Sequence, residues 1–547
     1  MMRTASARIP WPGALFCLGL LAGAGTAFGT LFVQIGQNFT GSTYGVNTVY
    51  RPADGDGAIG PNHFVELING RFAVYAKTNG AVVESMTSLA FWQNAGIVIP
   101  GGQDVSDPRV VFDPGSQRWF ASAMLFNSST LDGNSIVLAA SSSADPTGTW
   151  RGVSLVADPV SGYFADFPTL GLDVNGVYLS ANMFTPGLSG SNVGSALISI
   201  PKADLLQAVP TATNATSFGI LSFAGYGMVL QPVFNPMGTG NATVLAVGSL
   251  GVDFAFHSNL VATVISNASG PGAAVIGAPA SIPIPAYFVP INPPQPDPAA
   301  NDLDDGDARI SAIVRQVGNV IYAVHAVEAN AHLDTNTNWT GQAAIRWYKI
   351  NAADRSIIQS GTLSDPVLHY FFPSIAANAD GTVVIGCNGC STNSFVSSYA
   401  FVGETVNGVT TFGPPLLLEA GSASYKDTQP SYGATRWGDY SATSVDPTDP
   451  TRFWTIQMVP SAPQVYFTQI TEVRAVTQPA LALALTSTNV TLSWPVTVAS
   501  FDLQTASDLS PASVWSPASA IYATNSGVVL ATVPASPAGA FFRLKLQ

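Results

Sequence analysis

The chain has 547 residues, of which only 10% are charged, with 51 glycines, 39 prolines and a formal net charge of −13. This composition is typical of an extracellular all-β protein rather than a helical cytosolic enzyme. Its 20 lysines and arginines are outnumbered by 33 acids, which excludes nucleic acids and anionic membrane surfaces as partners because both require clustered cations.

Residues 1–29 have the pattern of a secretory signal peptide. Two arginines, Arg3 and Arg8, form a positive start, and an apolar stretch follows over residues 14–27. Small residues then precede a cleavage site. The apolar stretch is too short and too rich in glycine for a membrane span, so we expect no transmembrane segment in the mature chain. A lipid anchor through Cys17 is the alternative.

Residues 45–474 read as short strands separated by Gly, Pro, Asp and Asn turns. Asn69-Gly70 predicts a tight hairpin, and Asp113 is expected to cap the turn of a second hairpin. Only residues 201–209 suggest a helix, and a short one. Units of roughly fifty residues predict a large β-propeller of about six to eight blades, with seven favoured.

Two acid-rich turns, residues 54–57 and 302–307, offer hard oxygen ligands on loops. They predict calcium as a candidate ligand, although neither has the EF-hand spacing, and solvated acidic loops are the alternative. The calcium candidates are Asp54, Asp56, Asp304, Asp305 and Asp307. The second turn ends a Pro-rich segment, residues 282–307, that is expected to run extended over the surface.

After removal of the leader two cysteines remain, Cys387 and Cys390, in the sequence GCNGCS. Asn-Gly is a strong signal for a two-residue hairpin turn. We therefore predict that the two cysteines face each other across this turn and form a disulfide in an oxidising compartment. A zinc or redox role is the weaker alternative.

The stretch RWGDYSATSVDPTDPTRFW, residues 436–454, concentrates charge in a charge-poor chain. It is interpreted as a strand, an Asp-Pro turn and a return strand that closes the propeller. Strand alternation would place Arg436, Gly438 and Tyr440 on one face and Trp437 and Asp439 on the other. We interpret its charges as a locking device, with a binding site as the alternative.

Charged residues near strand starts could converge on the central pocket of a propeller, or form structural bridges between blades. The ligand-binding candidates are Asp107, Arg109, Asp166, Arg346, Trp347, Arg436, Trp437, Asp439 and Tyr440. No catalytic residue is assigned. The sequence shows no G-x-S-x-G, no metal-ligand spacing of histidines, and no identifiable pair of carboxylates for glycoside hydrolysis.

Residues 476–547 differ in character. They alternate apolar and polar residues with period two, as in ALALALTSTNVTLSWPV, and end on FFRLKLQ. This pattern predicts a small immunoglobulin- or fibronectin-like β-sandwich. The expected domains are therefore a signal peptide (1–29), a β-propeller (30–475) and a C-terminal β-sandwich module (476–547).

Several motifs in fixed order carry a family resemblance, among them GAIGPNHFVELINGRFAVYAKTNG, SDPRVVFDPGSQRWF, YFADFPTLGLDVNGVYLSANMF and RWGDYSATSVDP. Over residues 45–460 the chain resembles a family of secreted bacterial β-propeller-like proteins, described as sialidase-like or cell-surface proteins. The acidic Pro-rich loop and the Cys-Asn-Gly-Cys segment depart from that family. The resemblance implies fold and export to the outside of a bacterium. It implies no catalytic mechanism.

Together these observations predict a secreted or cell-surface protein without catalytic activity. It would recognise a glycan or another exported protein through the propeller face. The alternative is a sialidase-like carbohydrate-active hydrolase, and a third interpretation is a structural surface module. Release of a sugar product separates the hydrolase from a binding protein.

Overall fold

The computed structural model describes residues 31–547, except 271, 334–338, 428–429, 432, 478, 487, 497–500, 511–512, 536–539 and 547. The predicted leader lies outside these residues. The chain divides into two compact units, Ile35–Val473, and Met1–Gln34 with Arg474–Gln547. Each is described by itself, and the domain boundaries expected from the sequence stay predictions.

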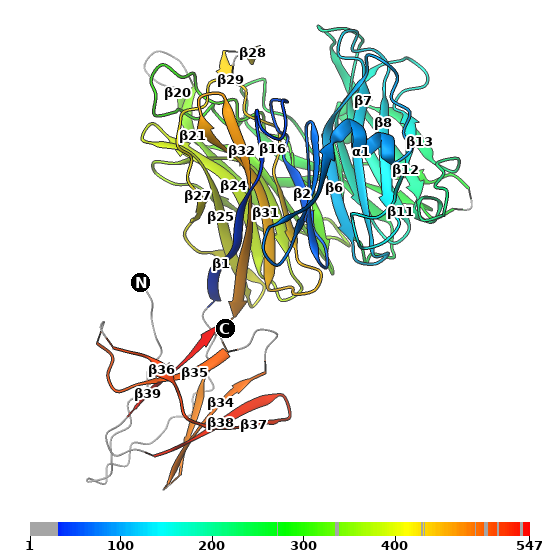
Figure 1. Ribbon diagram of the computed structural model, residues 1–547. Helices are drawn as coiled ribbons and strands as arrows, with labels where there is room; N and C mark the ends of the chain where they lie inside the picture. The colour runs from blue at the N-terminus through cyan, green and yellow to red at the C-terminus, as the bar shows by residue number, and fades with distance from the viewer. Residues whose placement is uncertain are drawn as a thin grey trace. The chain divides into compact units, whose positions relative to one another are not determined.

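The larger unit consists mainly of antiparallel sheets. Seven sheets of four or five strands occur among its described residues (Figure 1). The first three consist of β2 (Asp56–Ile59), β3 (His63–Ile68), β4 (Arg71–Ala76) and β5 (Val82–Thr87); β6 (Asp104–Asp113), β7 (Arg118–Phe126), β8 (Ser135–Ser141) and β9 (Trp150–Val156); and β10 (Phe164–Leu172), β11 (Gly176–Phe184), β12 (Asn192–Pro201) and β13 (Thr216–Leu221).

The next three sheets continue this order along the chain. They consist of β14 (Met228–Pro232), β15 (Ala242–Val247), β16 (His257–Ser266), β17 (Val275–Ile276) and β18 (Ala280–Tyr287); β19 (Arg315–Val317), β20 (Val320–Leu333), β21 (Trp339–Asn351) and β22 (Ile357–Leu363); and β23 (His369–Ala377), β24 (Val383–Ser391), β25 (Ser394–Val406), β26 (Val409–Phe412) and β27 (Leu416–Glu419). A two-stranded sheet, β28 (Pro430–Ser431) and β29 (Ala434–Thr435), follows.

The seventh sheet joins the two ends of the unit. Its strands are β30 (Ala442–Val445), β31 (Arg452–Ala462), β32 (Val465–Thr477) and β1 (Leu31–Thr43), with β1 on the outside next to β32. The helices are short: α1 (Ser88–Asn94), α2 (Lys202–Leu205) and α3 (Phe223–Tyr226). This repetition of four-stranded antiparallel sheets is consistent with a multi-bladed β-propeller.

The hydrophobic core lies between neighbouring sheets. Val65 and Phe72 of the first sheet pack with Trp119 of the second in one buried cluster, and further clusters join each following pair of sheets. A last cluster packs Phe64 of the first sheet against Trp454 of the seventh. The sheets therefore form a closed ring in which every sheet is stabilised by apolar contact with two neighbours.

Two turns confirm their sequence signals. Ile68 pairs with Arg71 across Asn69-Gly70, and Gly70 adopts a φ of +83°, which the tight turn needs and glycine provides at low cost. In the second hairpin the Asp113 carboxylate accepts from the Gly115 backbone N–H at 3.0 Å. This side-chain cap is the one expected of an Asp-Pro turn.

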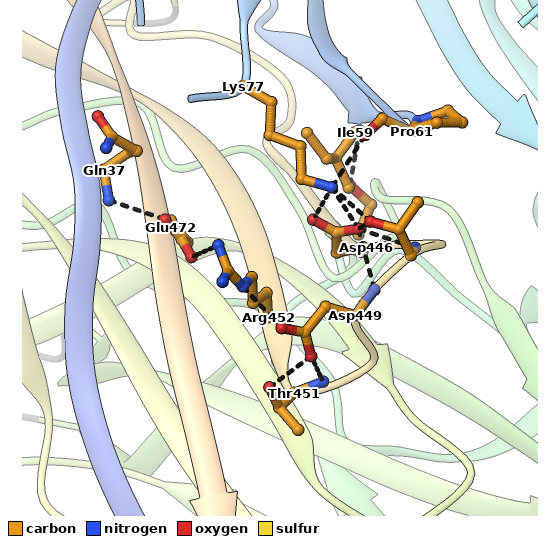
Figure 2. Close-up of polar contacts among 11 residues, drawn as sticks. Gln37, Ile59, Pro61, Lys77, Asp446, Asp449, Thr451, Arg452 and Glu472 are labelled. Atoms are coloured by element: carbon orange, nitrogen blue, oxygen red, sulfur yellow. Dashed lines mark hydrogen bonds and ion pairs between the residues drawn. The ribbon is translucent and has the colours of Figure 1, made fainter. Parts of the chain in front are cut away.

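The stretch from Asp446 to Arg452 is the predicted turn between two paired strands, and its charges lock the ring. Asp446 accepts from Lys77 Nζ of the first sheet at 2.7 Å. Arg452 lies 3.2 Å from the buried Glu472 carboxylate, which in turn accepts from the Gln37 N–H of β1 at 2.9 Å. Figure 2 shows this chain of contacts, which ties β1 to β31 and β32.

The Pro-rich segment 282–307 does not run over the surface as predicted. Its first part belongs to β18, which pairs with β16. Further on, Gln295 is buried and donates to the Tyr425 carbonyl at 2.9 Å, and Leu303 is fully buried. The prediction was wrong because apolar residues between the prolines supply enough surface to pack against the segment before β28.

The predicted disulfide is also wrong. Cys387 and Cys390 are free, buried thiols within one strand, β24, where Cys387 pairs with Tyr399 and Cys390 with His369. Residues three apart in a strand point to opposite faces and lie about 10 Å apart, too far for a disulfide. Asn388-Gly389 is strand rather than turn here, since flanking β-formers and buried neighbours override the local signal.

This arrangement predicts inert thiols. A chain that begins at residue 30 should show no reaction with a thiol reagent while folded, and two reactive thiols once unfolded in guanidinium. Burial raises the pKa of both thiols, so the reactive thiolate is absent near neutral pH. Dithiothreitol should leave the unfolding midpoint unchanged. A midpoint that falls when dithiothreitol is added would contradict the free thiols and support the predicted disulfide.

Among its described residues, the smaller unit has two small antiparallel sheets. One is ordered β33 (Ala482–Leu485), β34 (Asn489–Pro495), β38 (Val528–Pro534), β37 (Ile521–Asn525), and the other β36 (Ser516–Pro517), β35 (Phe501–Ala506), β39 (Phe541–Leu546). Trp494, Leu503 and Phe542 share its buried core. Throughout the described part of the chain, no helix is long and apolar enough to cross a membrane.

Candidate functional site

The site is built at the starts of the first strands of the sheets. These strands contact one another from sheet to sheet, including β2 with β6 and β2 with β30, so they surround the centre of the ring. Four of them carry a register shift together with a non-glycine residue at positive φ, near Asp107 (55°), Phe167 (53°), Val229 (58°) and Phe372 (46°). Such bulges re-aim side chains and are characteristic of functional sites.

Arg109 fills the centre of the ring beneath these bulges. It is 1% exposed, and its guanidinium lies 3.4 Å from the centre of the Tyr440 ring and 5.0 Å from that of Phe167. Its Nε donates to the Pro168 carbonyl at 3.1 Å, and its Nη1 lies 3.7 Å from Asp56. The predicted residues Arg109 and Tyr440 thus meet in a buried cation–π stack.

Asp107 is held by Asn69 and Ser106. Its backbone N–H donates to Asn69 Oδ1 at 2.9 Å, and Ser106 Oγ donates to its carboxylate at 2.8 Å. Burial raises the pKa of Asp107 well above its usual range, and the charges of Asp166 and further aspartates add to this effect. The raised pKa favours the protonated form of Asp107, which can donate a hydrogen bond.

Arg436 and Asp439 form a half-exposed ion pair, with Nη1 and Oδ1 2.7 Å apart. The segment is irregular rather than a strand, so the predicted alternation is wrong and the two side chains meet on one side. Although burial opposes it, the Arg436 guanidinium lowers the pKa of Asp439, which stays ionised. The Asp439 N–H donates to Asp54 at 3.0 Å.

Arg309 was not identified from the sequence and completes the site. Its guanidinium donates two hydrogen bonds, of 2.8 and 2.7 Å, to the Asp307 carboxylate. It also lies 4.6 Å from the centre of the Phe167 ring. Burial raises the pKa of the half-buried Asp166, and Arg309 counteracts that effect. The only sequence signal was the density of acids before Arg309.

Three predicted ligand-binding residues lie elsewhere. Arg346 of β21 donates to Thr362 Oγ1 at 2.7 Å, and Trp347 belongs to the core between the fifth and sixth sheets. Trp437 is 1% exposed, donates to Asn388 at 3.2 Å and packs edge-on against Tyr425. Arg346 is thus hydrogen-bonded to a neighbouring strand, and Trp347 and Trp437 pack in the core; that any of the three binds a ligand stays a prediction.

The five candidate calcium ligands lie in two turns, residues 54–57 and 302–307, and protein groups engage several of their carboxylates. Asp54 accepts from Asn69 at 2.7 Å, Asp56 faces Arg109, and Asp307 is engaged by Arg309. Asp305 is buried, and burial raises its pKa well above the usual range. Among the residues that the structure describes, no group of three or more acids, histidines or cysteines is placed to hold a metal ion.

The cluster of Asp107, Asp166, Arg309, Arg436 and Asp439, called here the mouth, therefore combines two acids with raised pKa values, one acid with a lowered pKa and two guanidiniums. Both guanidiniums already have a carboxylate partner. The mouth thus offers adjacent donors and acceptors while its charges are largely neutralised. Such a set suits hydrogen bonding to neutral polar groups.

No protein-family model matches the chain, and no curated protein matches it. Among solved structures it is similar to a protein of unknown function from Dyadobacter fermentans (10% identity, TM-score 0.33, covering 82% of this chain and 97% of that one). It is also similar to the α-L-arabinanase of Penicillium chrysogenum (10%, 0.33, 80% and 98%) and the sialidase of Trypanosoma rangeli (9%, 0.29, 68% and 54%).

Proposed function

We propose that the mouth binds a neutral, polyhydroxylated ligand of the glycan class and that the protein does not transform it. The observation that carries this proposal is the pairing of Arg309 with Asp307 and of Arg436 with Asp439 around one half-exposed centre. Each pair presents an N–H donor beside a carboxylate acceptor. Vicinal sugar hydroxyls need that combination, whereas a charged ligand would need an unpaired countercharge.

We further propose the fold and the location of the protein. The ring is a seven-bladed propeller, one blade for each of its seven sheets, and the smaller unit is a β-sandwich module. The protein is exported through its leader and acts outside a bacterial cell. Another exported protein that presents polar loops to the mouth is the alternative ligand.

Retention on polysaccharides tests the binding function. The chain from residue 30 is passed over a panel of immobilised neutral polysaccharides, and its affinity for any that retains it is measured. Replacing Asp439 by Asn should weaken retention at least tenfold, since a charge-assisted hydrogen bond contributes about 1.5–3 kcal/mol. Arg346→Met, outside the mouth, is the matched control. Retention that Asp439→Asn leaves unchanged contradicts the proposal.

One observation favours a glycoside hydrolase as the second candidate. The pKa of Asp107 is raised and that of Asp439 is lowered within the same mouth. An acid and a carboxylate with separated pKa values are what glycoside hydrolysis uses. Soluble sugar released in the same incubations, and abolished by Asp107→Asn, would establish the hydrolase. Retention without release establishes the binding protein.

A further inference from the structure

A pocket lies at the far ends of the first strands, away from the strand starts that carry Asp107 and Asp166. It has a volume of about 200 Å³ and is lined mainly by apolar side chains. Among its lining residues, Ile59 ends β2, Val317 ends β19, Ala377 ends β23 and Val445 ends β30. The mouth contains residues at the starts of the first strands. The two sites therefore lie toward opposite ends of the first strands, and Arg109 and Tyr440 are both buried.

One cation, Arg315, lines this apolar pocket. It is 9% exposed, and its buried Nε has no hydrogen-bond partner. Its guanidinium packs against Phe234, 5.0 Å from the centre of that ring. Burial lowers the pKa of Arg315 to about 10, so the side chain is still charged at neutral pH but is held at a cost in free energy.

Neither nearby acid compensates this charge closely. Asp446 also lines the pocket, but Lys77 Nζ and the Thr448 N–H and hydroxyl engage its carboxylate at 2.7 to 2.9 Å. Asp56 attracts Arg315 through space but lies closest to Arg109, at 3.7 Å. Burial raises the pKa of Asp56 to about 7, so it is only partly ionised at neutral pH. Among the described ion pairs, Arg315 forms none.

We propose that this pocket binds a small monocarboxylate with a compact apolar body, with the carboxylate on Arg315. A planar guanidinium matches a carboxylate with two parallel hydrogen bonds, and the apolar walls accept the hydrocarbon part. A multiply charged anion is disfavoured because one cation faces the pocket and the Asp446 carboxylate lines the same space. The proposal concerns a site separate from the mouth and does not depend on the function of the mouth.

The test measures, by titration calorimetry, the binding of benzoate and isovalerate to the full mature chain. Their neutral amides and inorganic phosphate serve as comparison ligands. Both carboxylates should bind, each at least tenfold more tightly than its amide and than phosphate. Arg315→Met should weaken benzoate binding at least tenfold. Arg346→Met, which removes an arginine outside the pocket, should bind benzoate as the parent does.

A second variant keeps the test decisive if Arg315→Met does not fold. Val317 is half-buried and lines the pocket, so Val317→Trp should fill the space and block benzoate while leaving the guanidinium in place. Three results would overturn the proposal: no binding of either carboxylate to the parent, equal affinity for benzamide, or benzoate affinity unchanged in both variants. Loss of glycan retention would contradict only the proposed function of the mouth.

Discussion

A chain that starts after Thr43, and therefore lacks β1, is expected to lose at least about 5 kcal/mol of unfolding free energy, enough to unfold a domain of ordinary stability. The main reason is Glu66, which is fully buried between the first and seventh sheets. Its carboxylate accepts from the Ser42 hydroxyl at 2.6 Å, the Ser42 N–H at 3.2 Å and the Tyr75 hydroxyl at 2.7 Å. Without β1 the two hydrogen bonds from Ser42 are lost, and each hydrogen bond to a charged group contributes about 1.5–3 kcal/mol.

The loss of the outer strand adds to this cost. Without β1, strand β32 becomes an edge with unpaired backbone groups. Glu472 also loses the N–H of Gln37. Urea unfolding, followed by tryptophan fluorescence, measures the effect, and a synthetic peptide of residues 31–43 added in trans should recover part of the lost stability. A truncated chain with the urea midpoint of the parent would contradict this account of the closure.

Replacement of Arg109 by Met is expected to lower the unfolding free energy by about 3–5 kcal/mol at pH 8. The substitution keeps the volume but leaves Asp56, which is 1% exposed, without its nearest cation. Burial already raises the pKa of Asp56 to about 7, and the loss of Arg109 raises that pKa further. The carboxyl must then be protonated in the folded chain.

The sign of the pH dependence follows from this pKa. An acid whose folded pKa exceeds its unfolded value destabilises the fold above the folded pKa, and the penalty declines as pH falls toward the unfolded pKa. The defect of Arg109→Met should therefore be largest at pH 8 and smaller at pH 5. Urea unfolding at both values measures it.

A double variant separates charge from packing. Asp56→Asn together with Arg109→Met removes both buried charges and should recover more than half of the loss at pH 8. Arg346→Met should change the unfolding free energy by less than about 1 kcal/mol, because its partners are surface groups. If the double variant is as unstable as Arg109→Met alone, the stack on Tyr440 rather than the ion pair accounts for the defect.

Much of the fold could be predicted because its signals are local. Period-two alternation, Asn69-Gly70 and the Asp113 cap are all encoded within a few residues, and the structure confirms the turns. Cys387 to Cys390 could not be predicted in this way. The Asn-Gly signal there is overridden because Cys387 pairs with Tyr399 and Cys390 pairs with His369. Both partners lie on other strands. Local turn chemistry competes with tertiary pairing, and the latter prevailed.

The candidate site was only partly predictable. Asp107, Asp166, Arg436 and Asp439 stood out as charges near strand starts, and the structure brings them together at the centre. Arg346 is also charged and Trp437 lies in the same RWGDY stretch, but both face other surroundings, because side-chain direction depends on bulges and irregular backbone that no short pattern encodes. Arg309 was not predicted because it follows an acidic turn, residues 302–307, that was interpreted as a candidate calcium site.

The bond between Gln37 and Glu472 joins residues 435 positions apart in the chain. Contacts of such long range give a high contact order, which slows folding because the ends must meet before the interaction stabilises anything. A chain made from its N-terminus thus holds β1 without its partner strand until nearly the whole ring has been synthesised. Its completed state is reached only after the last sheet emerges, and until then the unpaired strand is the segment most exposed to aggregation.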